Sequence, residues 1–253
     1  MRTNLVKKKD TKSPLNDGML DMVIAFDTTG SMCAYIEAVK LNIKKLIPKL
    51  FEQNSNLRIG LVAFGDYCDM PRKDKFGKAY QVCELTNDET RLIEFVTKAK
   101  NTSGGDVEEF YELVIKKIVE ETNWREGSIK AVLLIADSEP HRVGYHYGNK
   151  VVNNQIDWRE EARKAAEKGI KFDTVTINKN KTKWYKELSK ITNGVSAPFS
   201  TSLKTSQLIE AVALARGGER TRDLYKTTMD SFEASGDIEM TAVYAAYSKE
   251  VIS

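Results

Sequence analysis

The chain has 253 residues, 41% hydrophobic and 30% charged, which suffices for one large domain or one domain with an appendage. Its 39 basic and 36 acidic side chains leave a net charge of +3, and this near balance argues against a duplex-binding protein, which concentrates basic charge. No apolar stretch reaches membrane-spanning length, so we do not expect a transmembrane protein.

The N-terminal residues 1–18 form a polar, basic arm without the apolar segment of a secretion signal. Three cysteines, Cys33, Cys68 and Cys83, are scattered along the chain without a C-x-x-C pair. This usage fits buried thiols in a reducing compartment better than a disulfide framework. We therefore expect a cytoplasmic protein.

Short apolar runs predict six strands. Several of these runs are nearly continuous rather than alternating, as expected of strands buried on both faces of a mostly parallel sheet. The predicted strands are Leu20–Phe26, Arg58–Phe64, Gln81–Leu85, Ala131–Ala136, Phe172–Ile177 and a short one near Val195–Phe199.

Apolar stripes with a spacing of three and four residues predict helices between these strands. The first begins near Met32 and is ended or kinked by Pro48. Further stripes lie around Phe110–Ile118, Trp158–Ala166, Trp184–Ile191 and Thr205–Ala215. The alternation predicts a Rossmann-like, doubly wound α/β fold with helices on both sides of the sheet. Ligands of such sheets bind beyond the carboxyl ends of the strands.

The pattern changes after residue 216. Apolar residues from Leu224 to Phe232 and from Val243 to Val251 predict two helices separated by Gly236. We therefore divide the chain into the arm 1–18, a domain 19–216 and a helical extension 217–253, which packs on the domain or on a partner.

Oxygen-bearing side chains follow the predicted strands at three places. Asp27, Thr29 and Ser31 come directly after the first strand, where a helical pattern begins. Thr102 lies in a glycine-containing loop before a later helix, and Asp137 directly follows the fourth strand. Because strand ends share one edge of a parallel sheet, Asp27 and Asp137 are expected on the same rim, and we group Thr29, Ser31 and Thr102 with them as candidate ligands.

Magnesium prefers near-octahedral oxygen coordination at about 2.0–2.1 Å and keeps several of its waters. The hydroxyls of Thr29, Ser31 and Thr102 can bind such an ion directly, while Asp27 and Asp137 supply negative charge through waters. A site of this kind is electron-poor on its open side, where an incoming carboxylate can complete the coordination.

Each residue also has a simpler interpretation. Alone, Thr29 or Ser31 would be a helix N-cap, and Asp27 would be a turn residue. Asp106 and Glu109 fit a variant capping box, a structural role that we favour.

Two other features receive structural interpretations. His141 is taken as a packed or solvated loop histidine rather than a catalytic group. The lysines around Trp184 and Tyr185 could form a nucleic-acid patch, but a solvated helix start with its aromatic rings facing the core is favoured.

The three motifs together resemble the von Willebrand factor A domain and its metal-ion-dependent adhesion site. Asp27, Thr29 and Ser31 match the family's D-x-S/T-x-S motif, and Thr102 and Asp137 match its second-loop threonine and third-loop aspartate. The order along the chain also agrees.

The resemblance is closest to intracellular and microbial members that read D-x-T-G-S-M, G-G-D-x-P-E and D-A-P-P-H. Glu108 stands where proline is common, and Glu139 departs from the third motif. Both departures concern loop shape more than the expected ligands.

The resemblance implies a Rossmann-like fold, bound Mg²⁺ or Mn²⁺, and recognition of an aspartate or glutamate of a partner protein without enzymatic chemistry. Relatives inside cells often act as scaffolds in assemblies, some beside AAA+ ATPases, so such a subunit is an expected partner. Neither a nucleic acid nor a membrane is expected as a partner.

Two alternatives remain open. Asp27-Thr28-Thr29-Gly30-Ser31 resembles the D-K-T-G-T motif of haloacid-dehalogenase-like phosphatases, with Asp27 as the nucleophile. However, Thr28 replaces the lysine, Thr29 replaces the second acid, and the later paired-acid motif is missing. The other alternative is a structural assembly protein driven by its C-terminal helices.

Overall fold

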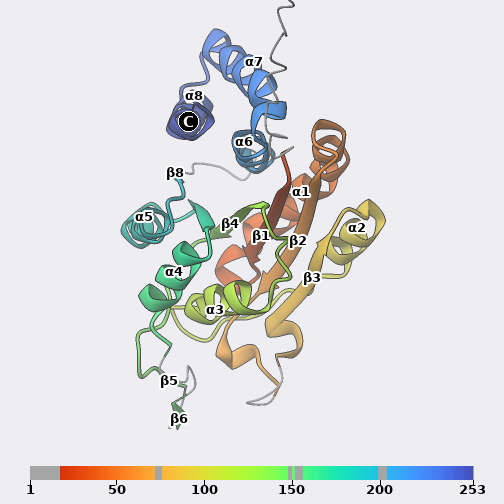
Figure 1. Cartoon of the computed structure of the whole chain (residues 1–253). Helices are drawn as coiled ribbons and strands as arrows, with labels where there is room; N and C mark the ends of the chain where they lie inside the picture. The colour runs from red at the N-terminus through yellow and green to blue at the C-terminus, as the bar shows by residue number, and fades with distance from the viewer. Residues whose placement is uncertain (1–17, 72–75, 148–149, 152–155, 199–203, 253) are drawn as a thin grey trace, which may run out of the picture.

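The computed structural model describes residues 18–71, 76–147, 150–151, 156–198 and 204–252. The predicted N-terminal arm lies outside these residues except for Gly18, and Phe199 of the last predicted strand also lies outside them. The described chain forms a central sheet between two layers of helices (Figure 1).

The main sheet has six strands in the order β3-β2-β1-β4-β7-β8. All neighbouring strands are parallel except β2 and β3, which are antiparallel. The strands are β1 Leu20–Asp27, β2 Leu57–Phe64, β3 Tyr80–Thr86, β4 Ile129–Ala136, β7 Ile170–Thr176 and β8 Ser196–Pro198, and a separate pair is formed by β5 His146–Tyr147 and β6 Lys150–Val151. The predicted mostly parallel α/β fold is therefore confirmed.

Eight α-helices and four short 3₁₀ helices lie in the described part of the chain. The α-helices are α1 Cys33–Gln53, α2 Glu89–Lys98, α3 Tyr111–Glu121, α4 Trp158–Glu167, α5 Thr182–Ile191, α6 Thr205–Arg216, α7 Glu219–Ser235 and α8 Ile238–Ile252. The 3₁₀ helices are η1 Gly30–Met32, η2 Tyr67–Asp69, η3 Gly77–Ala79 and η4 Lys179–Lys181.

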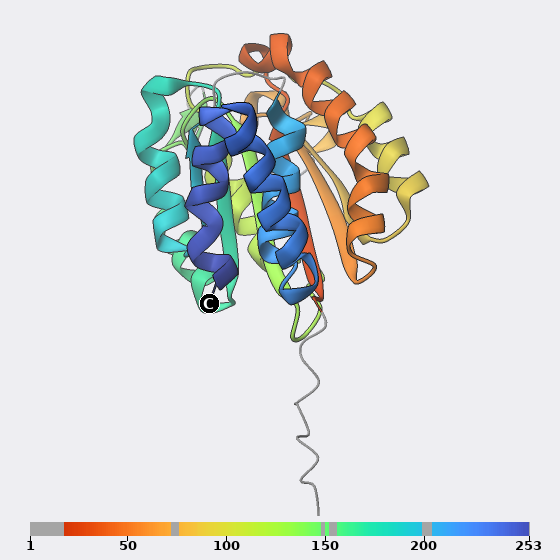
Figure 2. The same cartoon turned by 90° about the horizontal axis from the view of Figure 1, so that it is seen from above.

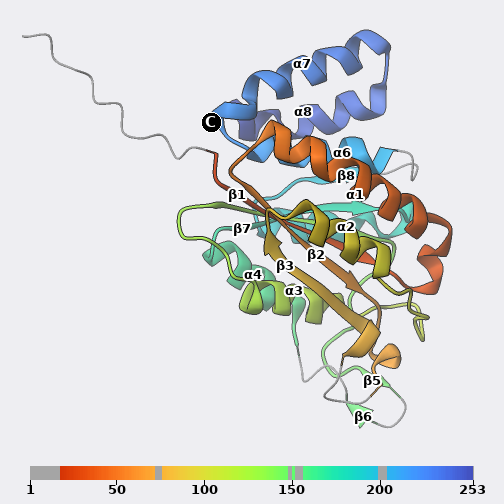
Figure 3. The ribbon, with the colours of Figure 1, turned by 90° about the vertical axis from the view of Figure 1, so that its right-hand side faces the viewer.

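Alternate side chains of the central strand β1 enter two separate cores. Met22 and Ile24 pack with residues of α1, α2, α6, α7 and α8, whereas Val23 and Ala25 pack with residues of α3, α4 and α5. Figure 3 shows these two groups of helices on opposite sides of the sheet. Burial on both faces explains the continuous apolar run in the sequence.

Two local predictions need correction. Of the two effects predicted for Pro48, an end or a kink, the end is wrong, because α1 continues through it to Gln53. Leu50, beyond the proline, is buried in the core of that face, so packing offsets the backbone hydrogen bond that proline cannot donate. Helix α2 was not predicted, since its buried apolar stripe is limited to Leu92 and Val96.

Helices α7 and α8 form a hairpin that packs against α6 on one face of the domain. Figure 2 looks onto this face and shows the blue helices near the orange-red α1. The chain reverses at Gly236, whose φ of 73° is in the left-handed region that favours glycine. Residues of this hairpin join the core of the sheet: Tyr225, Met240, Val243, Tyr244 and Tyr247.

The cysteines differ in exposure. Cys33 is exposed, Cys68 is partly exposed and Cys83 is buried, and all three are free thiols. The expectation of buried thiols is therefore correct for Cys83 and wrong for Cys33. Among the described helices, none combines the length and the apolar character needed to cross a membrane.

Candidate metal centre

The carboxylate of Asp27 ends the central strand β1 and is 0% exposed. Its Oδ1 accepts hydrogen bonds from the backbone N of Thr29 at 2.7 Å and from Thr29 Oγ1 at 2.6 Å, and its Oδ2 accepts one from Tyr111 Oη at 2.5 Å. Burial raises the pKa of Asp27 to about 7, although these hydrogen bonds oppose the shift. Asp27 is therefore a fixed carboxylate that is costly to ionise without a nearby cation.

Three more of the predicted residues continue from Asp27 in a line of close contacts between oxygen atoms. Thr29 Oγ1 lies 3.3 Å from Ser31 Oγ, which donates a hydrogen bond to Asp137 Oδ1 at 3.1 Å. Asp137 directly follows β4, the neighbour of β1 in the sheet. The structure thus brings Asp27, Thr29, Ser31 and Asp137 together, as the sequence predicts.

Thr102 lies at the base of the second loop. Its backbone N donates to Thr28 O at 2.9 Å, and its Oγ1 lies 3.0 Å from Thr28 Oγ1. Because Thr28 Oγ1 donates its own proton to Phe64 O at 2.8 Å, Thr102 must be the donor in the hydroxyl pair. Thr102 therefore contacts the first loop through Thr28 and keeps its oxygen lone pairs for other partners.

The close approach of the second loop also requires glycine at residue 65. A Cβ atom on Gly65 would lie 2.4 Å from Thr102 Oγ1, which is too close for two non-bonded atoms. Because residue 65 has no side chain, the loop after β2 leaves space for the side chain of Thr102.

Glu109 also belongs to this site, although its spacing from Asp106 predicted a capping box. It is 3% exposed, its carboxylate interacts with Thr29, and its Oε2 has no hydrogen-bond partner among the described residues. Burial raises its pKa to about 10, and repulsion from Asp27 and Asp66 adds to the shift. Glu109 therefore brings a second buried carboxylate next to Asp27.

The predicted capping box of Asp106 and Glu109 is wrong. Helix α3 begins at Tyr111, its N-cap residue is Phe110, and no side chain caps it. Asp106 instead accepts a hydrogen bond from Tyr145 Oη at 2.6 Å. The spacing resembled a capping box, but the loop places both carboxylates at the sheet edge.

Tyr111 connects two of the loops. Its buried hydroxyl donates to Asp27 and accepts a hydrogen bond from the backbone N of Ser138 at 3.1 Å. Nothing in the sequence points to this role, because Tyr111 looks like any other apolar position of its helix.

A cavity of about 280 Å³ opens on this group of residues. Its wall includes Ser31, Glu109 and Asp137 from the group itself, and Lys181 stands at the same cavity. Lys181 Nζ lies 3.2 Å from Glu139 Oε2. The cavity therefore combines exposed oxygen ligands with a cationic side chain.

The donor set fits a hard divalent cation. All five predicted ligands offer oxygen atoms, which Mg²⁺ and Mn²⁺ prefer. Burial raises the pKa of the Asp27 and Glu109 carboxyls, and a bound cation would favour their ionised forms.

Comparison with known proteins identifies the family and the fold. A family model described as the von Willebrand factor type A domain matches residues 21–213. The alpha-protein kinase vwkA of Dictyostelium discoideum is 27% identical over 129 residues, which are 50% of this chain and 20% of that protein. The chain thus spans about a fifth of the length of this relative.

Two solved structures share the fold. The von Willebrand factor type A protein from Catenulispora acidiphila matches with a TM-score of 0.56 and 12% identity, covering 79% of this chain and 43% of that one. The conserved hypothetical protein BatB from Bacteroides thetaiotaomicron matches with a TM-score of 0.52 and 16% identity, covering 78% of this chain and 98% of that one.

Proposed function

Since the chain belongs to the von Willebrand factor type A family, we propose that it is a metal-dependent protein-binding module. A divalent cation, Mg²⁺ or Mn²⁺, is held by Asp27, Thr29, Ser31, Thr102 and Asp137, and it binds an aspartate or glutamate side chain of a partner protein. The observation that carries this proposal is the convergence of four of these side chains, in which Thr29 donates to buried Asp27, Ser31 donates to Asp137, and the two hydroxyl oxygens lie 3.3 Å apart.

The roles of the residues follow from their placement. The hydroxyl oxygens of Thr29, Ser31 and Thr102 are neutral ligands, and Asp27 and Asp137 supply the negative charge. The cavity beside Ser31 and Asp137 has room for a side chain from outside. Lys181 at the same cavity offers the incoming carboxylate a second positive charge.

A single contact between metal and carboxylate cannot select one partner. A stable complex buries roughly 1,200–2,000 Å² in total, so the loops around the cavity must form most of the interface. We propose that the module serves as a scaffold in a cytoplasmic assembly, in which an AAA+ ATPase is one candidate subunit.

The burial of Asp27 favours binding over phosphatase chemistry. A carboxylate that attacks phosphorus needs a free oxygen facing the substrate. Both oxygens of Asp27 accept hydrogen bonds inside the protein, and the side chain is fully buried. We therefore propose no catalytic step.

The packing of the C-terminal hairpin also favours a binding module over assembly through these helices. The apolar residues Met240, Val243 and Tyr247 of α8 are buried in the domain's own core. They are consequently not available on the surface to join a second chain.

Two measurements test this proposal: the thermal stability of the protein in Mg²⁺, and its Mg²⁺-dependent capture of partner proteins. A ligand at 100 times its dissociation constant stabilises a protein by about 2.7 kcal/mol, so thermal melts should shift upward in Mg²⁺ and return with chelator. Asp27→Asn should remove the shift and also the Mg²⁺-dependent capture of protein partners.

Asp157→Asn is the matched control. Asp157 caps α4 by accepting a hydrogen bond from Arg159 N at 2.8 Å, and asparagine is an equally good cap. This variant should retain both the magnesium shift and the capture. An equal magnesium shift in wild type and Asp27→Asn would contradict the proposed site.

A further inference from the structure

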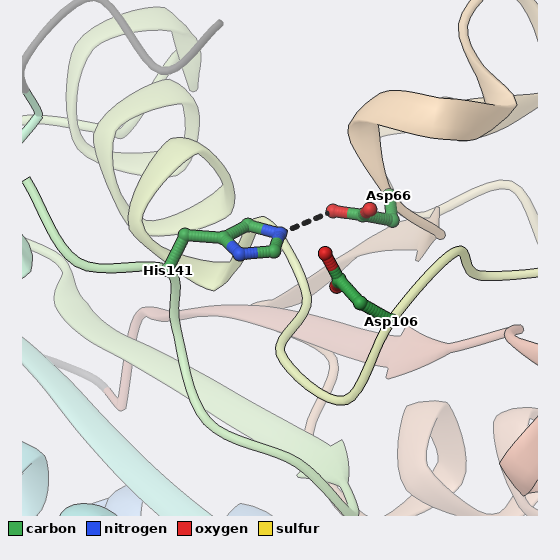
Figure 4. Close-up of side chains that lie close together, drawn as sticks. All are labelled: Asp66, Asp106 and His141. Carbon is green, nitrogen blue, oxygen red and sulfur yellow. Dashed lines mark hydrogen bonds and ion pairs between the residues drawn. The ribbon is translucent and has the colours of Figure 1, made fainter. Parts of the chain in front are cut away.

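A second group of metal-ligating side chains lies beside the first. Asp66 follows β2, Asp106 is in the second loop, and His141 lies in the loop after β4. One ligand atom from each lies within 4.8 Å of the other two. Figure 4 shows the three side chains pointing toward one another. None of the three is among the proposed ligands of the first site.

The buried carboxylate of Asp66 gives a second, independent indication of a ligand, because one of its oxygens lacks a hydrogen-bond partner among the described residues. Asp66 is 0% exposed and His141 is 1% exposed, and Asp66 Oδ1 lies 2.7 Å from His141 Nε2. The other oxygen, Asp66 Oδ2, is buried and has no hydrogen-bond partner in the described part of the chain. Leaving a buried acceptor unsatisfied costs about 1–3 kcal/mol. Asp66 is also the N-cap residue of η2, in a capping box with Asp69, but its Oδ2 meets no donor at hydrogen-bond geometry from any residue that the structure describes.

The imidazole ring is held in place by its neighbours. The backbone N of His141 donates to Glu112 Oε2 at 3.1 Å, and the ring stacks on Tyr145 with centroids 3.6 Å apart. Tyr145 in turn donates its hydroxyl to Asp106 at 2.6 Å. These contacts fix the backbone and the ring plane of His141 and connect them to Asp106 through Tyr145.

The local charge also favours a cation. Repulsion from Asp66 contributes, after burial, to the raised pKa of both Glu109 and Glu112. A cation bound to Asp66 would lower the energy of all three carboxylates at once.

A path from solvent exists next to the cluster. A cavity of about 510 Å³ is lined by Asp106 and His141, together with Tyr145 and the chain's other histidine, His146. Asp106 also lines the cavity of the first site. The two groups are therefore neighbours at the same edge of the sheet, each with its own opening.

We propose that Asp66, Asp106 and His141 bind a second divalent cation, of the transition-metal class represented by Zn²⁺. Zn²⁺ takes both histidine nitrogen and carboxylate oxygen as ligands, and a site with three protein ligands keeps a water in the fourth position. Imidazole distinguishes this site from the all-oxygen first site, because Mg²⁺ rarely takes nitrogen ligands and Zn²⁺ readily does.

For Asp66 and His141 the geometry needs little adjustment, whereas Asp106 is placed only within 4.8 Å of the other two ligand atoms. Zinc ligands at about 2.0–2.2 Å in a tetrahedral arrangement lie roughly 3.3 Å apart. Asp66 Oδ1 and His141 Nε2 are 2.7 Å apart while they share a proton. Replacing that proton by the cation requires this pair to separate by about half an ångström.

Titration of Zn²⁺ into the full chain tests the proposal, with excess Mg²⁺ present to occupy the first site. Calorimetry and elemental analysis should give one Zn²⁺ per chain. Asp66→Asn and His141→Gln should each weaken Zn²⁺ binding by at least about 10-fold. His146→Gln, which changes the other histidine at the same cavity, and Asp27→Asn, which removes the first site, should leave Zn²⁺ affinity unchanged.

A second measurement does not depend on variants that fold. Adding Zn²⁺ to the ¹⁵N-labelled wild-type chain should shift the Nε2 resonance of His141 and not that of His146. The proposal is overturned if no Zn²⁺ binds in excess Mg²⁺, if His141 does not respond, or if Asp66→Asn binds Zn²⁺ as wild type does. It is also overturned if Asp27→Asn loses Zn²⁺ affinity to the same extent as Asp66→Asn.

Discussion

The hydroxyl of Tyr111 lies 2.5 Å from Oδ2 of Asp27 and joins the first turn of α3 to the end of the central strand. The same hydroxyl accepts a hydrogen bond from the backbone N of Ser138 in the third loop. One phenol oxygen therefore determines where two of the three loops of the candidate metal centre lie relative to each other.

Replacing this hydroxyl should destabilise the protein and weaken the metal centre. Tyr111→Phe leaves Ser138 N without its acceptor and Asp27 Oδ2 without its donor, and an unsatisfied buried group costs about 1–3 kcal/mol. Urea unfolding with chelator should measure this loss, and melts in Mg²⁺ should show a smaller metal shift. Tyr147→Phe, at an exposed position, should change the free energy of unfolding by less than about 0.5 kcal/mol. Equal effects of the two variants would contradict this role of Tyr111.

Without metal, stability should fall as the pH rises. Burial raises the pKa of Asp27 from its ordinary value of 3.8 to about 7 in the folded protein. Its contribution is therefore fully present below pH 4 and is lost as the pH rises through about 7. Glu109, with its pKa raised to about 10, acts in the same direction at higher pH.

Asp27→Asn should reduce this dependence, because asparagine does not titrate. The reduction is at most about 4 kcal/mol between pH 4 and 8, from 1.36 kcal/mol for each pKa unit. Urea unfolding in chelator at a series of pH values measures it. If wild type and variant show parallel pH profiles, Asp27 is not the buried, uncompensated carboxylate described above.

The hydroxyl of Thr102 can be tested separately from its methyl group. If Thr102 Oγ1 binds the cation, Thr102→Val should weaken Mg²⁺ binding by roughly 10-fold, or about 1.4 kcal/mol, whereas Thr102→Ser should retain it. Calorimetric titration with Mg²⁺ measures both. Full affinity in Thr102→Val would show that Thr102 only supports the loop, and Glu109→Gln would then be the variant expected to lose affinity.

The C-terminal hairpin should contribute to the stability of the domain. Met240 is 0% exposed and packs in the core of the sheet, so Met240→Ala should lower the free energy of unfolding by about 2–5 kcal/mol. Ile238, in the same helix, is 84% exposed, and Ile238→Ala should change it by less than about 0.5 kcal/mol. Denaturant unfolding followed by circular dichroism provides both values. Equal, small effects would mean that α8 is not an integral layer of the fold.

The sheet was predictable because strands buried on both faces appear in the sequence as continuous apolar runs. Continuous apolar runs such as Ala131–Ala136 predict strands covered on both faces, and the observed β4 extends this one only to Ile129. Helix α2 and the continuation of α1 through Pro48 were not predictable, since both depend on what the helix packs against.

The first part of the candidate site was predictable for a related reason. Asp27 and Asp137 directly follow neighbouring parallel strands, so the sheet register alone brings them to one edge. Thr29 and Ser31 are two and four residues from Asp27, and the turn after β1 keeps them close to it.

By itself, the sequence determined the α/β layering and the oxygen-bearing triplet after the first strand, because both follow from local periodicity and strand ends. Only the tertiary structure decided that Glu109 turns toward Thr29, that Tyr111 reaches Asp27, and that Asp66 meets His141. These pairs are separated by up to 84 residues in the chain. Their meeting depends on how whole loops pack over the sheet edge, and local propensity carries no information about such packing.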